Sequence, residues 1–334
     1  MNTPTIRSAI DEYIESVSLA RSENTARTYR NGMKSFCDML EKNEIDADSP
    51  ITVLNEDLFN NYVKYSKYYS STTENLYINV AKKFYEFLNA QNYSNYNLSK
   101  IKYLIRQRSR KPGIRLPQFP EKDILTVIDY ALSLPGKTAE TEEKYLINLR
   151  DSAFIITLAD TGLRIHEACN LRRGNIDWEM QKAMIIGKGN KQGIIRFSDR
   201  SINSMRNYLL ERQHLDGKCN KPLSSMPIFA RHDKGAGNDI LPITTKTGRL
   251  IIEERVEECL GKNAVGTITP HSFRHYFVTT VLRKTDNLKI AQEFARHASI
   301  TVTQRYVHLA SDELDRTYRN IFDEKYDTKD TDND

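Results

Sequence analysis

Five polar elements in the C-terminal half of this 334-residue sequence carry side chains suited to phosphate chemistry. They are Arg164 with Glu167, Lys188 in a Gly-Lys-Gly turn, His271 with Arg274, His297, and Tyr306. Arginines bind phosphate oxygens through paired hydrogen bonds, lysine and histidine transfer protons, and a tyrosine oxygen can act as a nucleophile. Together these residue types form a complete set for breaking and rejoining a DNA strand without metal or ATP.

Arg164 and Glu167 follow an apolar segment that ends at Gly162. Glycine allows a sharp turn before the next helix, so Arg164 is predicted to lie at a helix start, where anions are favoured. Glu167, three residues later, is within reach to orient the guanidinium. A surface ion pair is the simpler alternative for these two residues alone.

Lys188 lies in a predicted hairpin turn, between two glycines that give the turn freedom to place an ammonium group beside a phosphate. Lys191, on the same turn, competes for this role. Most such turns are only solvent-facing hairpin tips.

His271 and Arg274 are about one helical turn apart and are predicted to project from one helix face, after Pro270 at the helix start. His275 can share that face, so the choice of the working histidine stays open. A capping or core histidine is the common structural explanation for either one.

Tyr306 is one of 18 tyrosines, and packing is the simplest role for any one of them. It follows His297 by nine residues, in a polar Thr-Gln-Arg-Tyr-Val-His stretch. A phenol, with a pKa of about 10, attacks only when its proton is removed and its oxyanion is stabilised. Nearby arginines and histidines are predicted to supply that environment.

The composition is that of a globular chain long enough for two domains, with 39% hydrophobic and 28% charged residues. The longest apolar stretch, 153–159, is too short to span a bilayer, and acidic residues near the N-terminus argue against a signal peptide. We therefore expect a cytoplasmic protein without membrane contact. The cysteines show no metal-binding spacing, so we expect reduced thiols and no zinc; they are Cys37, Cys169, Cys219 and Cys259.

Apolar periodicity predicts a mainly α fold with a small β-sheet (α+β). A helical domain at 1–108, with four helices over about 6–17, 29–40, 55–65 and 72–88, precedes a Pro-Gly linker at 109–117. The second domain, 118–322, is predicted to contain helices over 122–132, 145–161, 201–213, 247–260, 271–284, 288–297 and 311–322, and a hairpin of strands 183–186 and 193–197. The acidic residues 323–334 are expected to be disordered.

Positive charge is concentrated in one segment. Residues 1–99 hold ten Lys or Arg against thirteen Asp or Glu, whereas 100–115 hold seven basic residues and no acidic one. A solvated connector is the simple explanation, but beside the motifs above a segment that lies on phosphates is favoured. The candidate DNA-contacting residues are Arg27, Arg30, Lys34, Lys82, Lys83, Lys100, Lys102, Arg106, Arg108, Arg110, Lys111 and Lys191.

In their order and spacing, these motifs make the sequence resemble the tyrosine recombinase family, which includes phage integrases and Xer resolvases. The resemblance covers about residues 120–320 as the catalytic domain, and the first domain resembles the family's SAM-like core-binding domain. It implies a catalytic set, supported by Glu167, of Arg164, Lys188, His271, Arg274, His297 and Tyr306.

The resemblance also implies a mechanism. The two arginines hold the scissile phosphate, Tyr306 forms a 3′-phosphotyrosyl link, Lys188 protonates the leaving 5′ oxygen, and no cofactor is needed. The implied partners are double-stranded DNA with core sites, further copies of this chain in a tetramer, and accessory DNA-bending proteins. The helix at 311–322 would join the copies, although packing in its own core is an equal alternative.

Three features depart from the family pattern. Ala295-Arg296 stands where Leu-Gly is common, Phe273 replaces the usual leucine, and the loop 229–242 is longer than in compact members. Two other functions stay open: a type IB topoisomerase, which relaxes supercoils as a monomer, and a catalytically silent DNA-binding regulator. Among recombinases, the departures favour a mobile-element integrase over a Xer-like resolvase.

Overall fold

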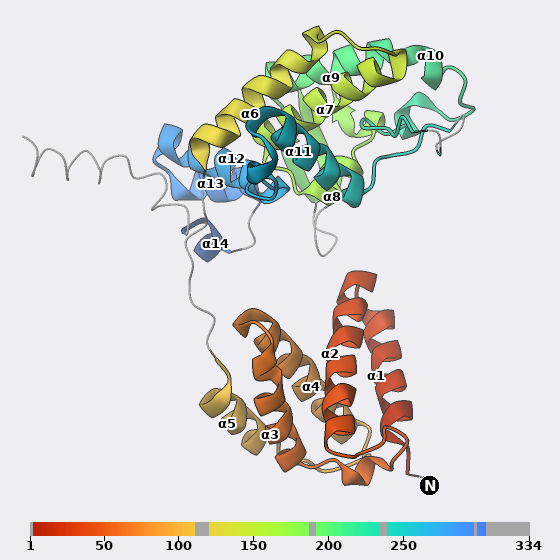
Figure 1. Cartoon of the computed structure of the whole chain (residues 1–334), viewed down its shortest axis with the longest axis vertical. Coiled ribbons are helices and arrows are strands. Elements are labelled where there is room, and N and C mark those ends of the chain that lie inside the picture. The colour runs from red at the N-terminus through yellow and green to blue at the C-terminus, as the bar shows by residue number, and fades with distance from the viewer. Residues whose placement is uncertain are drawn as a thin grey trace, which may run out of the picture. The chain divides into compact units, whose positions relative to one another are not determined.

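The computed structural model describes residues 3–110, 120–186, 192–233, 235, 239–296 and 299–304. The chain divides into two compact units, Met1–Arg115 and Leu116–Asp334 (Figure 1). Each unit has a hydrophobic core of its own. Helices dominate both units, and one small sheet lies in the second, so the predicted mainly α fold with a small β-sheet is confirmed.

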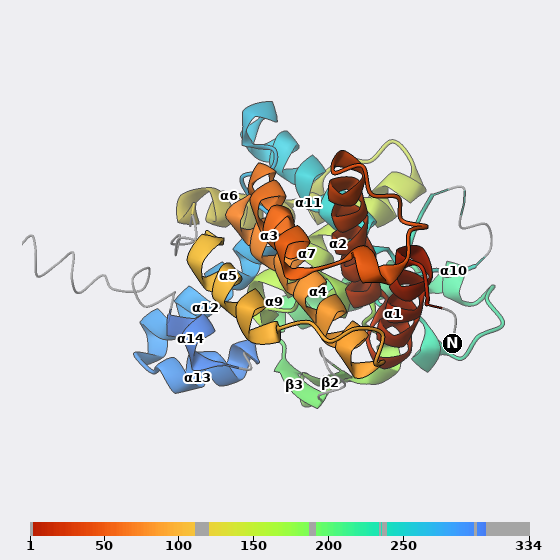
Figure 2. The same cartoon turned by 90° about the horizontal axis from the view of Figure 1, so that it is seen from below.

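The N-terminal unit contains five helices in the described part, one more than predicted. They are α1 (Ile6–Ala20), α2 (Glu23–Lys42), α3 (Glu56–Tyr65), α4 (Ser71–Ala90) and α5 (Leu98–Arg108), with short 3-10 turns η1 (Ile51–Val53) and η2 (Ser66–Tyr68). The prediction of four helices was wrong. The fifth helix, α5, lies largely in the basic segment, for which no helix was predicted. This helix lies beside α3 (Figure 2). Its Ile101 and Leu104 are buried.

Arg110, at the start of the predicted linker, binds residues of the N-terminal unit through its side chain. Its Nε atom lies 2.5 Å from Oε2 of Glu74, a fully buried residue of α4. Its Nη2 group also donates to the backbone carbonyls of Lys67 and Tyr69. A buried carboxylate needs such a partner, so Arg110 stabilises the helical unit.

The C-terminal unit is built around a long central helix, α7, which packs against α6, α9 and α12. The helices are α6 (Glu121–Ser133), α7 (Glu142–Thr161), α8 (Ile165–Cys169), α9 (Asp199–Glu211), α10 (Gln213–Asp216), α11 (Thr245–Leu260), α12 (Pro270–Thr285), α13 (Leu288–Ala295) and α14 (Ile300–Gln304). The 3-10 turns are η3 (Leu134–Gly136), η4 (Arg173–Asn175), η5 (Leu223–Ser225) and η7 (Lys262–Ala264).

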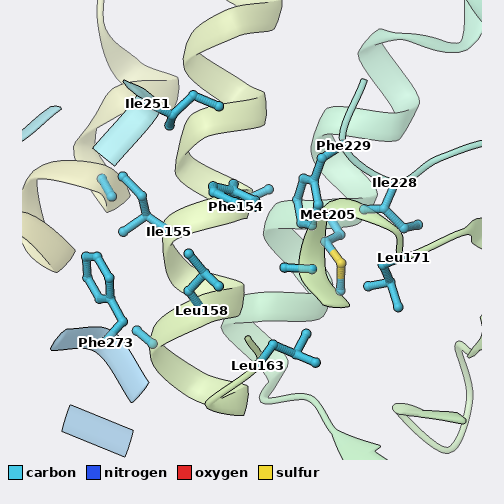
Figure 3. Packing of buried hydrophobic residues seen from close by; sticks show 14 of the residues in the cluster. Phe154, Ile155, Leu158, Leu163, Leu171, Met205, Ile228, Phe229, Ile251 and Phe273 are labelled. Atoms are coloured by element: carbon cyan, nitrogen blue, oxygen red, sulfur yellow. The ribbon is translucent and has the colours of Figure 1, made fainter. Parts of the chain in front are cut away.

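Helix α7 is buried on all sides, as expected for a helix with apolar residues around its whole circumference. Figure 3 shows its Phe154, Ile155 and Leu158 among side chains from other elements. The Phe154 ring meets the Phe229 ring edge-on, with centroids 5.1 Å apart. Phe273 of α12, the departure from leucine, is fully buried in the same core.

The sheet is a three-stranded antiparallel meander of β1 (Ile176–Asp177), β2 (Lys182–Ile186) and β3 (Gln192–Arg196). Ala183 pairs with Ile195 and both are buried, whereas the neighbouring pair Met184 and Ile194 is exposed. This alternation matches the predicted hairpin, to which the structure adds β1. The turn residues 187–191 lie outside the described residues.

The loop 229–242 is closed at its base by an isolated β-bridge between Ala230 and Pro242 and by a 2.9 Å hydrogen bond from the N–H of Arg231 to the carbonyl of Leu241. Residues 234 and 236–238 of this loop lie outside the described residues, as do the predicted helix at 311–322 and the acidic tail. No helix of the described ranges is long and apolar enough to cross a membrane.

Gly162 ends helix α7 in the left-handed conformation, with φ 58° and ψ 23°. A Cβ atom there would lie 2.4 Å from Cδ1 of Phe277. We predict that Gly162→Ala lowers the free energy of unfolding by about 2 kcal/mol or more, because backbone strain and overpacking add. Denaturant titration measures this loss. Gly136→Ala is the control, since its Cβ would meet nothing within 4 Å; equal stability losses in the two variants would contradict the argument.

Candidate active site

Arg164 is placed by the turn that follows α7. It is the N-cap residue of α8, and Glu167 lies in the first turn of that helix. The Glu167 carboxylate accepts the backbone N–H of Arg164 at 2.9 Å through Oε2 and the Arg164 Nη1 group at 3.1 Å through Oε1. The three-residue spacing thus brings the two side chains into contact, and the carboxylate holds the guanidinium.

Glu167 is a buried carboxylate with a second guanidinium beside it. Nη2 of Arg296 lies 2.9 Å from Oε2 of Glu167. Burial acts to raise the pKa of Glu167, but the charges of Arg296 and Arg164 and the N–H of Arg164 outweigh it, so the pKa lies below its ordinary value. Glu167 is therefore an ionised acceptor shared by two arginines.

Arg274 is buried on α12, one turn after the helix start. Pro270 and a capping box between Thr269 and Ser272 fix that start. The Arg274 guanidinium donates to the carbonyl of Gly162 through Nη1 and to the carbonyl of Ala295 through Nη2. It therefore ties the ends of α7 and α13 to α12.

Arg164 and Arg274 line one cavity of about 420 Å³. Its polar wall carries three arginines, two histidines and one carboxylate: Arg164, Arg249, Arg274, His166, His271 and Glu253. Apolar side chains close the rest, including Leu163 and Ile268. Three guanidinium groups against one carboxylate favour an anionic ligand such as a phosphate diester.

Of the two competing histidines, His271 lines this cavity and His275 is not among the lining residues. Partial burial lowers the pKa of His271, and the charges of Arg274, Arg164 and Arg249 lower it further. Burial, with the nearby His271 and Arg274, lowers the pKa of His275 to about 4. Both rings are neutral at pH 7, and His271 is the one placed to exchange a proton with a ligand.

Two arginines of this site were not predicted from the sequence. Arg249 projects from α11, and no motif or spacing signalled it. Arg296 was noted only as a departure from the family pattern, and the signal was its position directly before His297. The predicted residues Lys188, Lys191, His297 and Tyr306 lie outside the described residues.

The candidate DNA-contacting residues of the N-terminal unit differ in whether their side chains have polar partners. Several have polar partners: Arg30 with Glu23, Lys82 with Glu86, Lys83 with the Tyr29 hydroxyl, Lys100 with Asp57, and Arg108 with Asn60. Arg27, Lys34, Lys102 and Arg106 are exposed and form no ion pair within the described part of the chain. Lys111 lies outside it.

Metal ligands are not grouped in the ranges that the structure covers. No cluster of three or more His, Cys, Asp or Glu side chains is placed there to hold an ion. The four cysteines are unpaired thiols, and burial raises the pKa of Cys169 to about 12, so this thiol is protonated and inert.

We predict that Arg249→Leu raises the pKa of His271 toward 6.5, because it removes one of the positive charges that disfavour the imidazolium. An NMR titration of the histidine ring nitrogens measures both histidines in one experiment. The pKa of His275 should stay at about 4, since its shift comes from burial, His271 and Arg274. A shift of equal size at both rings, or at neither, would show that Arg249 does not act on His271 through the cavity.

Comparison with known proteins adds sequence and structural relatives. The model of the phage integrase family matches residues 137–313, and that of the phage integrase N-terminal SAM-like domain matches residues 10–92. Tyrosine recombinase XerC of Listeria monocytogenes serotype 4b (strain F2365) is 27% identical over 300 residues, which cover 89% of this chain and 91% of the relative. Tyrosine recombinase XerC of Staphylococcus epidermidis (strain RP62A) is 28% identical over 310 residues, 92% and 94% of the two chains.

Two solved structures share the fold. The XerH site-specific recombinase, bound to a palindromic difH substrate in a post-cleavage complex, aligns with a TM-score of 0.67 at 16% identity over 93% of this chain and 83% of that one. A lambda integrase dimer bound to a core site aligns with a TM-score of 0.62 at 17% identity over 91% and 77%. Since the family's sequence model covers more than half of the chain, this protein belongs to the phage integrase family.

Proposed function

We propose that this chain is a site-specific tyrosine recombinase that cleaves and rejoins DNA strands through a covalent 3′-phosphotyrosyl intermediate. The observation that carries the proposal is the convergence of Arg164, His271 and Arg274 on one cationic cavity. Membership of the phage integrase family supports it, as do relatives that are named tyrosine recombinases.

The two arginines bind the non-bridging oxygens of the scissile phosphate and stabilise the charge of the pentacovalent transition state. Arg164 shares the single carboxylate of Glu167 with Arg296, so its positive charge is only partly offset. Arg274 is held in place by hydrogen bonds to the carbonyl oxygens of Gly162 and Ala295.

In the cleavage step, the Tyr306 oxygen bonds to phosphorus while the bond from phosphorus to the 5′ oxygen breaks. His271, neutral because of its lowered pKa, accepts the phenol proton. Lys188 donates a proton to the leaving oxygen, which becomes a 5′-hydroxyl, and His297 hydrogen-bonds the phosphate. A 5′-hydroxyl of a partner strand then attacks the phosphotyrosine, joins that strand and restores Tyr306.

The ligand in this scheme is duplex DNA with two core sites. The structurally similar XerH and lambda integrase were solved bound to DNA, which supports this choice for the present chain. The proposed domains are 1–108 and 118–322, and the basic segment 100–115 spans the end of the first domain and most of the linker. We assign phosphate contacts to the exposed side chains of Arg27, Lys34, Lys102 and Arg106.

We further infer a tetramer on two DNA sites, joined through the segment 311–322, as in the sequence-based expectation. Its apolar residues recur on one helical face, which suits docking into a neighbouring copy. The mass of the complex on a two-site DNA, with and without this segment, tests that assembly. Accessory DNA-bending proteins and action within the cytoplasm complete the proposal.

We predict that Tyr306→Phe abolishes covalent capture of DNA and leaves DNA affinity within about threefold, because only the nucleophilic oxygen is lost. Fragmented genomic DNA of the source organism serves as the probe. Adducts that survive SDS are counted on gels, and their DNA is sequenced to reveal the target. An SDS-resistant adduct formed by the variant would assign the nucleophile elsewhere.

The recovered target also separates the alternatives. A recombinase exchanges strands between two such sites, whereas a topoisomerase only relaxes supercoiled plasmids, and a silent regulator gives no adduct with the unmodified chain.

We predict that Lys188→Ala slows cleavage of the ordinary substrate about 100-fold or more. The same variant should cleave a substrate with a bridging 5′-sulfur at nearly the rate of the unmodified chain. Sulfur is a good leaving group and needs no proton donor, so loss of the acid matters only for oxygen. Lys191→Ala is the matched control from the same turn, and it should cleave both substrates normally. If the rescue appeared with Lys191→Ala instead, the acid would be Lys191.

A further inference from the structure

Arg296 adopts a conformation that an arginine avoids. It caps the end of α13 with φ 54° and ψ 44°, the left-handed region that favours glycine. Non-glycine residues keep such angles only where the surrounding contacts determine them, and they concentrate at functional sites. The contacts of the Arg296 side chain therefore bear on its role.

The side chain points back toward the catalytic arginines and is largely buried, with 14% of its surface exposed. Its Nη2 group binds Oε2 of Glu167 at 2.9 Å, the same oxygen that accepts the backbone N–H of Arg164. The other carboxylate oxygen binds Nη1 of Arg164. Arg296 thus fixes the rotation of the carboxylate that orients Arg164.

The stem of Arg296 lies against β3 at Gly193. A Cβ atom at position 193 would lie 2.9 Å from Cδ of Arg296, closer than such atoms approach. Gly193 is not among the glycines with positive φ, so its backbone does not exclude alanine. Within the described contacts, Gly193 is needed because the arginine stem occupies the space that a methyl group would take.

We propose that Arg296 is a positioning residue for catalysis. Its stem packs against Gly193, its guanidinium orients the Glu167 carboxylate, and Glu167 in turn orients the Arg164 guanidinium toward the scissile phosphate. The proposal rests on the proposed function. A purely structural clamp is the alternative, and it would affect folding and DNA affinity rather than the cleavage step.

The experiment compares Arg296→Gly, Arg296→Lys, Gly193→Ala and the double variant G193A/R296G. Glycine is at ease at φ 54°, so Arg296→Gly relieves backbone strain and is expected to fold. In Arg296→Lys, the lysine ammonium group restores a positive charge beside the Glu167 carboxylate. Gly193→Ala leaves every charge unchanged, so any effect on the arginines must pass through the position of Arg296.

With the target duplex recovered by covalent capture, single-turnover cleavage is measured at saturating protein. Arg296→Gly should slow cleavage about 10- to 100-fold, since misplacement of a catalytic group by about an ångström has effects of this size. DNA affinity should change little, the variant should stay folded at the assay temperature although Glu167 loses one donor, and Arg296→Lys should recover part of the rate. Losses of affinity and melting temperature that accompany the rate in proportion would overturn the proposal in favour of the clamp.

The double variant tests whether Gly193 acts through the position of Arg296. Gly193→Ala should slow cleavage in the chain that keeps Arg296 and should have no further effect when combined with Arg296→Gly, which gives a coupling in the double-mutant cycle. Equal effects of Gly193→Ala in both backgrounds would show that Gly193 does not act through Arg296.

Titration calorimetry with inorganic sulfate repeats the cycle without DNA. Gly193→Ala should weaken sulfate binding several-fold only where Arg296 is present. If the unmodified chain forms no DNA adduct, the proposed function fails while the sulfate cycle still tests the positioning role. If adducts form but both cycles are additive, the function stands and the role of Arg296 falls.

Discussion

The buried carboxylate of Glu167 is the constraint on which the site depends. Removal of a carboxylate from water costs several kcal/mol unless charges and hydrogen-bond donors replace the lost hydration. Two guanidinium groups and one backbone N–H do so here, from Arg164 and from Arg296. Because these two arginines belong to the start of α8 and the end of α13, the carboxylate is satisfied only when both segments are in place. The catalytic geometry and the packing of this corner therefore form together.

Arg274 joins the ends of two helices through its guanidinium group. It binds carbonyl oxygens at Gly162 and Ala295, at the C-terminal ends of α7 and α13. The last carbonyls of a helix have no intrahelical partner and carry the negative end of its dipole. A guanidinium satisfies them and is itself held in place by these two hydrogen bonds. Burial, together with the charges of Arg274, Arg164 and Arg249, lowers the pKa of His271. The neutral imidazole is the form that the proposed mechanism needs for proton acceptance.

Much of this could be predicted from the sequence, and the failures have physical causes. The long apolar segment before Gly162 and the Pro270 helix start determine where Arg164 and Arg274 emerge, so their helices were found within a few residues. Helix α5 was missed because its basic residues were interpreted as part of a phosphate-contacting segment, whereas the burial of its apolar residues beside α3 decides its conformation. Arg249 enters the cavity by tertiary packing of α11, which leaves no local pattern. The contact between positions 193 and 296 is likewise invisible in a single sequence.

That last contact bears on how this chain departs from its family. Glycine commonly precedes the histidine in the family pattern. Here Arg296 takes that position in the left-handed region, and the small residue, Gly193, lies against its stem on β3. A glycine at 296 would relieve the backbone but leave Oε2 of Glu167 with one donor fewer. The strain is thus offset by a second cation on the carboxylate. Since the carboxylate then binds two arginines instead of one, less of the charge of Arg164 is cancelled, and in the proposed mechanism that charge stabilises the anionic transition state.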